Sequence, residues 1–395
     1  MRLSMAVLAG AVMLYAQEPA PLGLEVVQLA AIRAHMLSNL ARQPNYTCVE
    51  TVERSHRTAA TRKFQLVDTI RLEVRLVDGK EMFGWPGSKK FEDTELRNIV
   101  TTGAIGNGNF ALHARAIFGN MNAAFDYRGV DNAAKRYDFR VPLLGSGYKL
   151  RTQKGEAIVG YHGAVWADPD SLDVRRIDVV ADDIPVTLGL AEASDRMDYS
   201  RAHIGDGEFL LPASSELTMV DLDGSENRNR VRFAACRQFA GESVLTFGDA
   251  PESAGEAAPV AEIDLPADLA MRLTLLDDVD ARNSAVGDAV HARLENDLRH
   301  KGKVLFSKGA TVLGRITRME RREGYTELGL EFSEIESQAA RAHLKGKLDE
   351  VMGLEPFGPG VRRTRAPVAK PGEGLIPLTP ARPRLLHGIL MFWRT

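Results

Sequence analysis

The chain is poor in cysteine, in long apolar runs and in net charge, and each scarcity excludes a class of protein. Only two of its 395 residues are cysteine, and neither a Cys-x-x-Cys pair nor a His-Glu-x-x-His motif occurs, so we predict no metal site. Beyond residue 16, no segment approaches the roughly 20 apolar residues of a membrane helix, so we expect no transmembrane segment in the mature chain. The net charge of −3 gives no reason to expect nucleic acid as a partner.

Catalytic signatures are also scarce. No Gly-x-Ser-x-Gly elbow occurs, and the glycines Gly103, Gly106 and Gly108 lack the Gly-Lys-Ser/Thr of a phosphate-binding loop. A hinge between two helices is the simpler interpretation of these glycines. The acidic residues Asp168 and Asp170 are typical of a turn. We therefore expect a protein that is not an enzyme and needs no cofactor, with a hydrolase as the weaker alternative.

Residues 1–16 have the pattern of a secretory signal peptide. Arg2 precedes an apolar run that ends near Tyr15, and Ala16 comes before a polar segment. The run is too short to span a bilayer. Cleavage after Ala16 is favoured over an uncleaved anchor, and it predicts export to the periplasm or cell envelope.

The two cysteines, Cys48 and Cys236, each lie in a strand-like segment. Export to an oxidising compartment favours a disulfide between them, and two buried thiols are the alternative. A bridge between positions so far apart would tie the first strand of a domain to its last. We therefore predict a latch between the two ends of an open half-barrel.

The rest of the sequence predicts a mainly β (α+β) fold. Residues 24–42 place apolar side chains at helical spacing and end before Pro44, which predicts an N-terminal helix. Alternation from Ile70 to Leu76 predicts an antiparallel strand with one wet face, and Asp78 with Gly79 predicts a hairpin turn. Lid-like short helices are expected within residues 93–120. Consecutive strands with short turns are expected as a meander at 125–128, 136–141, 147–151, 156–167, 172–181, 195–204, 208–220 and 229–240.

We expect two domains. An antiparallel half-barrel is assigned to residues 17–247 and a smaller β-barrel-like domain to residues 263–395. Residues 248–262 between them are small, acidic and without aromatics, which is typical of a flexible linker. Within the second domain, residues 354–384 are rich in proline and predict a long loop. The apolar C-terminal segment requires burial and predicts a last strand of that domain.

Aromatic side chains are the most suggestive candidates for a binding site. Their plainest role is to fill a core between sheet and helices. Alternatively, some of them line a groove for an acyl chain or another apolar ligand, which a strongly bent sheet covered by helices forms naturally. The candidate groove residues are Phe83, Trp85, Phe110, Phe118, Phe139, Tyr161 and Trp166.

The first domain resembles the outer-membrane lipoprotein carrier superfamily (LolA/LolB-like) over roughly residues 24–247. The resemblance rests on the order of helix, antiparallel meander and inserted helices, and on the segment Gly160-Tyr-His-Gly-Ala-Val-Trp-Ala-Asp-Pro-Asp-Ser-Leu-Asp-Val-Arg-Arg-Ile. It implies an unclosed β-barrel with a helical lid that holds acyl chains on its concave side. Residues 44–54 also resemble the start of exported proteins from soil bacteria such as Acidobacteria. The chain departs from the carriers in its length, its paired cysteines and its second domain.

The second domain is similar to the barrel domain of TrbI-type conjugation and type IV secretion proteins over about residues 263–335. The similarity is carried by Ala285-Val-Gly-Asp-Ala-Val and by Gly302-Lys-Val-Leu-Phe-Ser-Lys-Gly-Ala-Thr-Val-Leu-Gly-Arg-Ile. It implies an exported interaction module. We therefore expect an envelope protein that binds a lipid, lipoprotein or apolar peptide in the half-barrel and docks an envelope protein through the second domain. The alternative is a structural or sensory protein whose half-barrel is filled by its own side chains.

Overall fold

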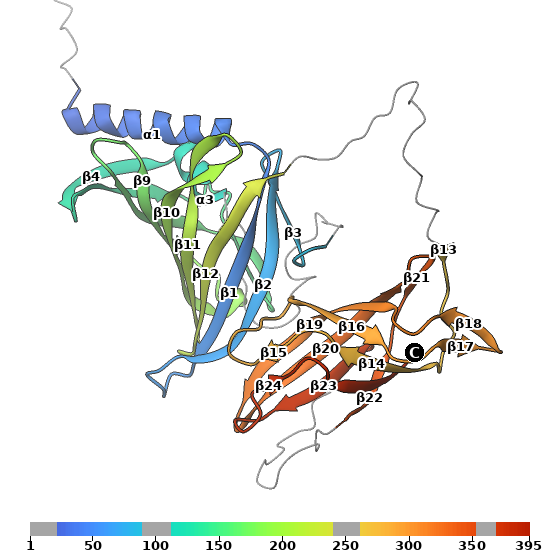
Figure 1. Ribbon diagram of the computed structural model, residues 1–395. Helices are drawn as coiled ribbons and strands as arrows, with labels where there is room; N and C mark the ends of the chain where they lie inside the picture. The colour runs from blue at the N-terminus through green and yellow to red at the C-terminus, as the bar shows by residue number, and fades with distance from the viewer. Residues whose placement is uncertain (1–21, 89–111, 240–260, 353–368) are drawn as a thin grey trace, which may run out of the picture.

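The computed structural model describes residues 22–88, 112–239, 261–352 and 369–395, and it is dominated by two sheets whose ladders are antiparallel except at one edge of the second sheet (Figure 1). Helix α1 (Leu24–Arg42) lies along one end of the first sheet, and the short helix α3 (Leu112–Phe118) is inserted between its strands. This confirms the predicted fold class. The predicted signal peptide, most of the linker and the glycine-rich turn lie outside the described residues.

The first sheet has ten strands in the order β3-β2-β1-β12-β11-β10-β9-β8-β5-β4. The strands are β1 (Tyr46–Arg57), β2 (Gln65–Val77), β3 (Lys80–Gly84), β4 (Ala124–Asp131), β5 (Ala134–Val141), β8 (Gly160–Ala167), β9 (Val174–Asp182), β10 (Leu190–Ile204), β11 (Gly207–Asp221) and β12 (Glu226–Gln238). A separate hairpin of β6 (Lys149–Thr152) and β7 (Gly155–Ile158) is inserted between β5 and β8. The sheet is the predicted meander, and in the described residues its two edges, β3 and β4, do not pair with each other.

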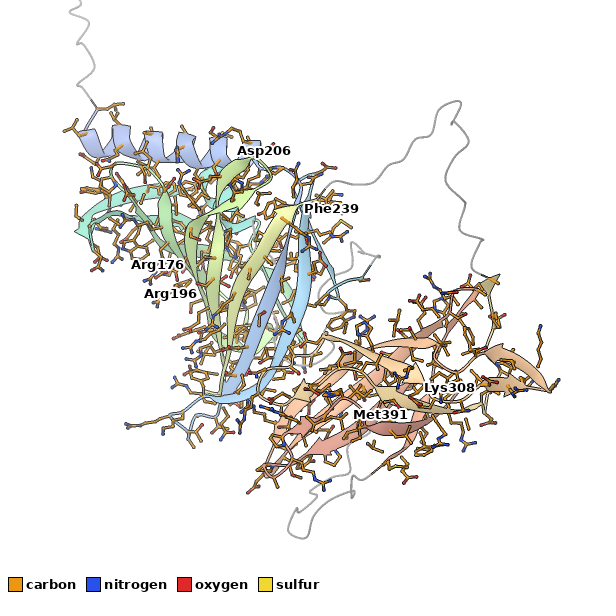
Figure 2. The ribbon with its side chains drawn as sticks, in the orientation of Figure 1. Arg176, Arg196, Asp206, Phe239, Lys308 and Met391 are labelled. Atoms are coloured by element: carbon orange, nitrogen blue, oxygen red, sulfur yellow. A yellow bond between two sulfur atoms is a disulfide. The ribbon has the colours of Figure 1, made fainter. Side chains whose placement is uncertain are left out.

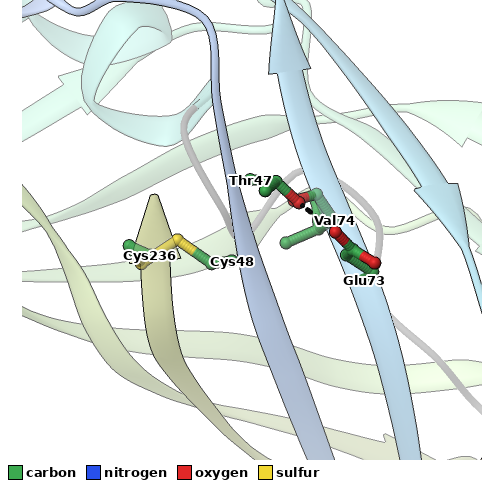
Figure 3. Close-up of a disulfide and its surroundings, with 5 residues drawn as sticks. All are labelled: Thr47, Cys48, Glu73, Val74 and Cys236. Carbon is green, nitrogen blue, oxygen red and sulfur yellow. Dashed lines mark hydrogen bonds between the residues drawn. A yellow bond between two sulfur atoms is a disulfide. The ribbon is translucent and has the colours of Figure 1, made fainter. Parts of the chain in front are cut away.

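The disulfide between Cys48 and Cys236 forms as predicted, but it does not latch an open gap (Figure 3). Strands β1 and β12 pair from Tyr46 opposite Gln238 to Arg57 opposite Glu226. The bridge therefore joins hydrogen-bonded neighbours in the middle of the sheet, beside a register shift, and the latch was a wrong prediction. Because the first strand of the meander pairs with the last, the opening lies at β3 and β4 instead.

Strand periodicity separates the two faces of this sheet. On β10, Asp195 and Met197 are buried, whereas Arg196 and Asp198 between and beyond them are exposed (Figure 2 labels Arg196). We call the buried face the concave face and the other the convex face. The convex face carries alternating arginine and acidic side chains, such as Arg176 beside Asp178. A one-side-wet antiparallel sheet follows from this alternation.

The second sheet has nine strands, eight in the order β13-β21-β20-β19-β16-β14-β25-β22, with β23 paired to β20. They are β13 (Ala261–Glu262), β14 (Ala270–Leu275), β16 (Ala289–Leu294), β19 (Thr311–Arg322), β20 (Tyr325–Glu336), β21 (Ala340–His343), β22 (Lys347–Val351), β23 (Glu373–Leu378) and β25 (Leu390–Arg394). Two short pairs form separate two-stranded sheets: β15 (Val279–Asp280) with β24 (Arg384–Leu385), and β17 (Leu298–His300) with β18 (Lys303–Phe306). No ladder among the described strands closes the nine-stranded sheet into a barrel.

Two predictions for this sheet concerned its C-terminal strand and the long loop over residues 354–384. Strand β25 lies between β14 and β22 with Met391 and Trp393 buried, as its apolar sequence predicts. The predicted loop over 354–384 is wrong at β23, where Ile376 and Leu378 are buried against β20. The strand tolerates Pro377 because, among the described residues, it has a paired neighbour on one side only.

The second sheet contacts the first through the edge of β2. Strand β3 pairs only with residues 73–77 of β2. Beyond that stretch, the Val286 amide donates to the Thr69 carbonyl (2.9 Å) and the Arg71 amide donates to the Val286 carbonyl (2.8 Å). Ile70 and Val286 belong to one apolar cluster that runs through both sheets. The second sheet thus covers an edge that β3 leaves open.

Candidate functional site

The concave face of the first sheet gathers most of the predicted groove residues. Phe83, Phe118, Phe139 and Tyr161 are all buried there. Phe139 packs edge-on against Tyr161, with ring centroids 6.1 Å apart. Phe110 lies outside the described residues. The concave face is therefore aromatic in its described part.

Helix α3 packs against this aromatic surface. Phe118 is fully buried and stacks on Phe125 at 6.3 Å. The Tyr161 hydroxyl donates to the carbonyl of Ala116 (3.2 Å), and Arg33 of α1 donates to the carbonyl of Phe118 (2.9 Å). A helix of seven residues has little stability of its own. Its position thus depends on these contacts and on the burial of Ala114 and Ile117 in the same apolar cluster.

The two tryptophan candidates lie elsewhere. Trp166 is on the convex face, where it stands opposite Arg136 and Arg176 and stacks between their guanidinium groups. Trp85 follows β3 and faces the second sheet, with the Arg315 guanidinium 5.5 Å from its ring. Neither tryptophan lies on the concave face, and the sequence did not separate them from the other candidates because both lie in strand-like segments.

A band of buried polar side chains crosses the concave face between its apolar clusters, and the sequence analysis missed it. We call it the polar band. The cross-strand register aligns Asp68, Arg54, Asn229, Leu217 and Asp195 in one row across β2, β1, β12, β11 and β10. The band comprises Asp68, Arg54, Glu50, Asn229, Ser215 and Asp195, with His113 of α3 over Asp195.

Part of the polar band is internally paired and part is not. The Arg54 Nε donates to Asp68 Oδ1 at 2.7 Å, which satisfies a buried ion pair. By contrast, both carboxyl oxygens of Asp195, Ser215 Oγ and Glu50 Oε2 are buried without a hydrogen-bond partner within the described ranges. Buried polar atoms are normally paired, so each exception requires an explanation.

Burial also changes how these groups titrate. Removal from water, together with the charge of Asp178, raises the pKa of Asp195 to about 7, and the neighbouring backbone amide of Arg196 offsets this only in part. Removal from water also raises the pKa of Glu50 to about 8, with a further contribution from the charge of Glu81. It lowers the pKa of His113 to about 4. At neutral pH His113 is therefore uncharged, and its 3.5 Å approach to Asp195 is not an ion pair.

The polar band gives no sign of metal binding or of a hydrolytic triad. Within the part of the chain that the structure describes, no group of His, Cys, Asp and Glu side chains has the geometry of a metal site. Ser215, His113 and Asp195 share the band, but no described group hydrogen-bonds to Ser215 Oγ. The serine–histidine contact that activates a nucleophile is thus not made.

One signal in the sequence points to the polar band. Asp195 lies in phase with Met197 and Tyr199, and Glu50 lies in phase with Val52, so both fall on the apolar face of their strands. A charged residue in the buried phase of a strand is rare without a function or a partner. The alternation of apolar residues along β1 and β10 is therefore enough to single out Glu50 and Asp195.

Comparisons with known proteins add little to this picture. No family model and no curated protein matches the chain. Among solved structures, a LolA superfamily protein from Nitrosomonas europaea is similar, with 10% identity, a TM-score of 0.28, and coverage of 53% of this chain and 94% of that one. A DUF1329 family protein from Desulfovibrio piger gives 12% identity, a TM-score of 0.26, and coverage of 54% and 92%. Likeness of this size identifies neither a ligand nor an activity for this chain.

No helix in the described ranges is long and apolar enough to cross a membrane.

Proposed function

We propose that this is an exported, non-enzymatic envelope protein that holds one apolar chain, from a lipid, lipoprotein or apolar peptide, in its half-barrel. The observation that supports the proposal is a concave face lined by Phe83, Phe139 and Tyr161 in a sheet whose described edges do not pair with each other. Ligand sites are typically concave and largely apolar, and they contain a few polar groups. In this protein the polar band supplies those polar groups.

Entry of a chain requires α3 to move. Phe118 occupies the aromatic surface in the present arrangement. We propose that α3 is a lid and that an apolar chain replaces the contacts of Phe118 with Phe125 and its neighbours. Such a displacement also exposes Ala114 and Ile117, which are buried in the same cluster, so the bound chain must replace their apolar contacts as well.

Native mass spectrometry of the protein purified from its own envelope tests the proposal. We expect a mass that exceeds the mature chain by one amphiphile. Phe139→Ala, on the concave face, should lower the occupied fraction, whereas Trp166→Ala, on the convex face, should leave it unchanged. A wild-type protein that carries only the bare chain mass under conditions that keep it folded contradicts the proposal. Circular dichroism verifies that each variant is folded.

The second candidate is a structural or sensory protein with a self-filled half-barrel. The complete burial of Phe118 favours it. The two candidates differ in what Phe118→Ala does. A lid predicts faster and greater uptake of an added apolar probe by this variant, whereas a self-filled core predicts a loss of stability with no uptake.

We further propose that the second sheet docks an envelope protein and that residues 1–16 are removed on export. The disulfide between Cys48 and Cys236 supports an oxidising compartment. N-terminal sequencing of the mature protein from a periplasmic fraction tests the export. A mature chain that starts at Met1 in the cytoplasm contradicts it.

A further inference from the structure

We propose that the polar band is the seat of the ligand's head group and that this head group is a primary ammonium on an apolar chain. This inference rests on the proposed function, since it assigns the polar end of the same ligand. Two neighbouring groups carry it, each buried and without a hydrogen-bond partner among the described residues: the Asp195 carboxyl and Ser215 Oγ.

Asp195 and Ser215 form the centre of this seat. Met197 stands directly opposite Ser215 on the neighbouring strand, and Asp195 is two residues before Met197. Asp195 and Ser215 are thus diagonal neighbours on one face, a separation of roughly 7–8 Å between backbones that a bridging donor spans. Asp195 is 2% exposed and Ser215 5% exposed, so neither carboxyl nor hydroxyl is satisfied by bulk water.

The charge of the polar band selects a cation with hydrogen-bond donors. Its one guanidinium, Arg54, is committed to Asp68. The imidazole of His113 is neutral at pH 7 because burial lowers its pKa. The remaining polar atoms of the band include carboxyl oxygens, which accept hydrogen bonds when the carboxyl group is ionised. An ammonium supplies three donors and the compensating charge, whereas a carboxylate or phosphate head would meet like charge.

The position of His113 links the seat to the lid. Its Nε2 lies 3.5 Å from Asp195 Oδ2, and its ring packs against Tyr148 with centroids 5.7 Å apart. Because His113 and Phe118 are on the same helix, displacement of α3 uncovers Asp195 and the aromatic surface together. The ammonium then takes the place beside Asp195 that the imidazole holds in the closed arrangement.

Isothermal titration of the delipidated full-length protein at pH 7 with four amphiphiles tests the assignment. The probes are dodecylammonium, dodecyltrimethylammonium, 1-dodecanol and lysophosphatidylethanolamine, each below its micellar concentration. We expect dodecylammonium to bind at least about tenfold more tightly than dodecyltrimethylammonium, which has the charge but no N–H donor, and than dodecanol. Lysophosphatidylethanolamine binding more tightly than dodecylammonium assigns a lipid head group, and the reverse order assigns a simple amine.

Two aspartates on one strand supply the matched variants. Asp195→Asn should abolish the tenfold preference while still binding dodecanol. Asp198→Asn, on the exposed face of the same strand, should retain the preference. Equal affinity of wild type for dodecanol and dodecylammonium overturns the ammonium assignment while the half-barrel function stands. Absence of binding by every probe contradicts the proposed function itself.

Discussion

At the scale of single residues, the most unusual feature is a carboxyl group buried without a hydrogen-bond partner among the described residues. Asp195 sits among Met197, Ala193 and Leu217 on the concave face, where its ionised form is costly. A leucine or asparagine at position 195 would avoid the cost of burying an ionised carboxyl group. Proteins keep such conflicts mainly at functional sites, which is why Asp195 rather than the aromatic surface points to the chemistry of the ligand.

This burial makes stability depend on pH. The pKa of Asp195 is about 7 in the folded protein, above its ordinary value, so between these values the folded state holds a proton that the unfolded state releases. The contribution of Asp195 to stability therefore falls as pH rises from about 4 to about 7. The pKa of Glu50 extends the fall to about 8, whereas His113, whose pKa is about 4, acts in the opposite direction below its ordinary pKa of 6.5.

We predict that, when the pH is raised from 5 to 8, the stability of Asp195→Asn increases relative to that of wild type by on the order of 2 kcal/mol. Urea unfolding at both pH values measures the difference. Asp198→Asn serves as the control and should run parallel to wild type. An Asp195→Asn curve that also runs parallel would show that Asp195 titrates normally.

At the scale of elements, the sequence was sufficient to predict a helix or strand wherever its buried residues recur at regular spacing. Helix α1 and strand β2 were predicted because their apolar residues recur at helical and strand spacing, and both form at the predicted positions. The same reasoning failed at β23, since proline and arginine around 369–384 hide a short apolar run that needs β20 as a partner. The polar band was missed for a related reason. Alternation along β1 and β10 singles out Glu50 and Asp195, but the row that joins Asp195 to Asn229, Arg54 and Asp68 exists only once the strands pair.

The pairing of β1 with β12 determines how the disulfide contributes to the stability of the first sheet. The bridge lies beside a register shift where Ala235 takes a left-handed conformation (φ 50°), so it secures an irregular site in a ladder that is otherwise regular. On the other side of β1, Thr47 Oγ1 donates to Glu73 Oε1 (3.0 Å) and to the Val74 carbonyl (3.1 Å), which ties the same point to β2 (Figure 3).

We predict that reduction lowers the stability of the first sheet by about 2–5 kcal/mol without unfolding it, because β1 and β12 remain hydrogen-bonded. Hydrogen exchange should speed up at residues 46–49 and 234–238, with strands β19 and β20 of the second sheet unchanged. Urea midpoints with and without reductant give the magnitude. Identical midpoints would mean that the bridge adds nothing to the ladder.

At the scale of the whole molecule, the two sheets are joined by a close backbone contact as well as by the chain. Gly287 has φ +100°, and a side chain there would overlap the Arg71 carbonyl oxygen and approach the Trp85 ring to 2.6 Å. Arg71 also forms an ion pair with Asp288. The glycine thus lets the second sheet reach the edge of β2.

We predict that Gly287→Ala separates the two sheets and splits thermal unfolding into two transitions. Gly309→Ala is the matched control, because Gly309 has a similar φ of +92° and a β-carbon there would meet no described atom within 4 Å. Both substitutions strain the backbone, but only the first disturbs the contact. Differential scanning calorimetry distinguishes them, and a single transition in both variants would show that the contact does not couple the sheets.

Ligand binding by the half-barrel requires that the concave face of the first sheet accept an apolar chain beneath α3. Fluorescence titration of the delipidated wild-type protein with the neutral probe N-phenyl-1-naphthylamine measures this directly. We predict saturable uptake of one probe per chain, in the micromolar range, with competition by dodecylammonium. A linear, non-saturable signal that dodecylammonium does not displace would contradict ligand binding in the half-barrel.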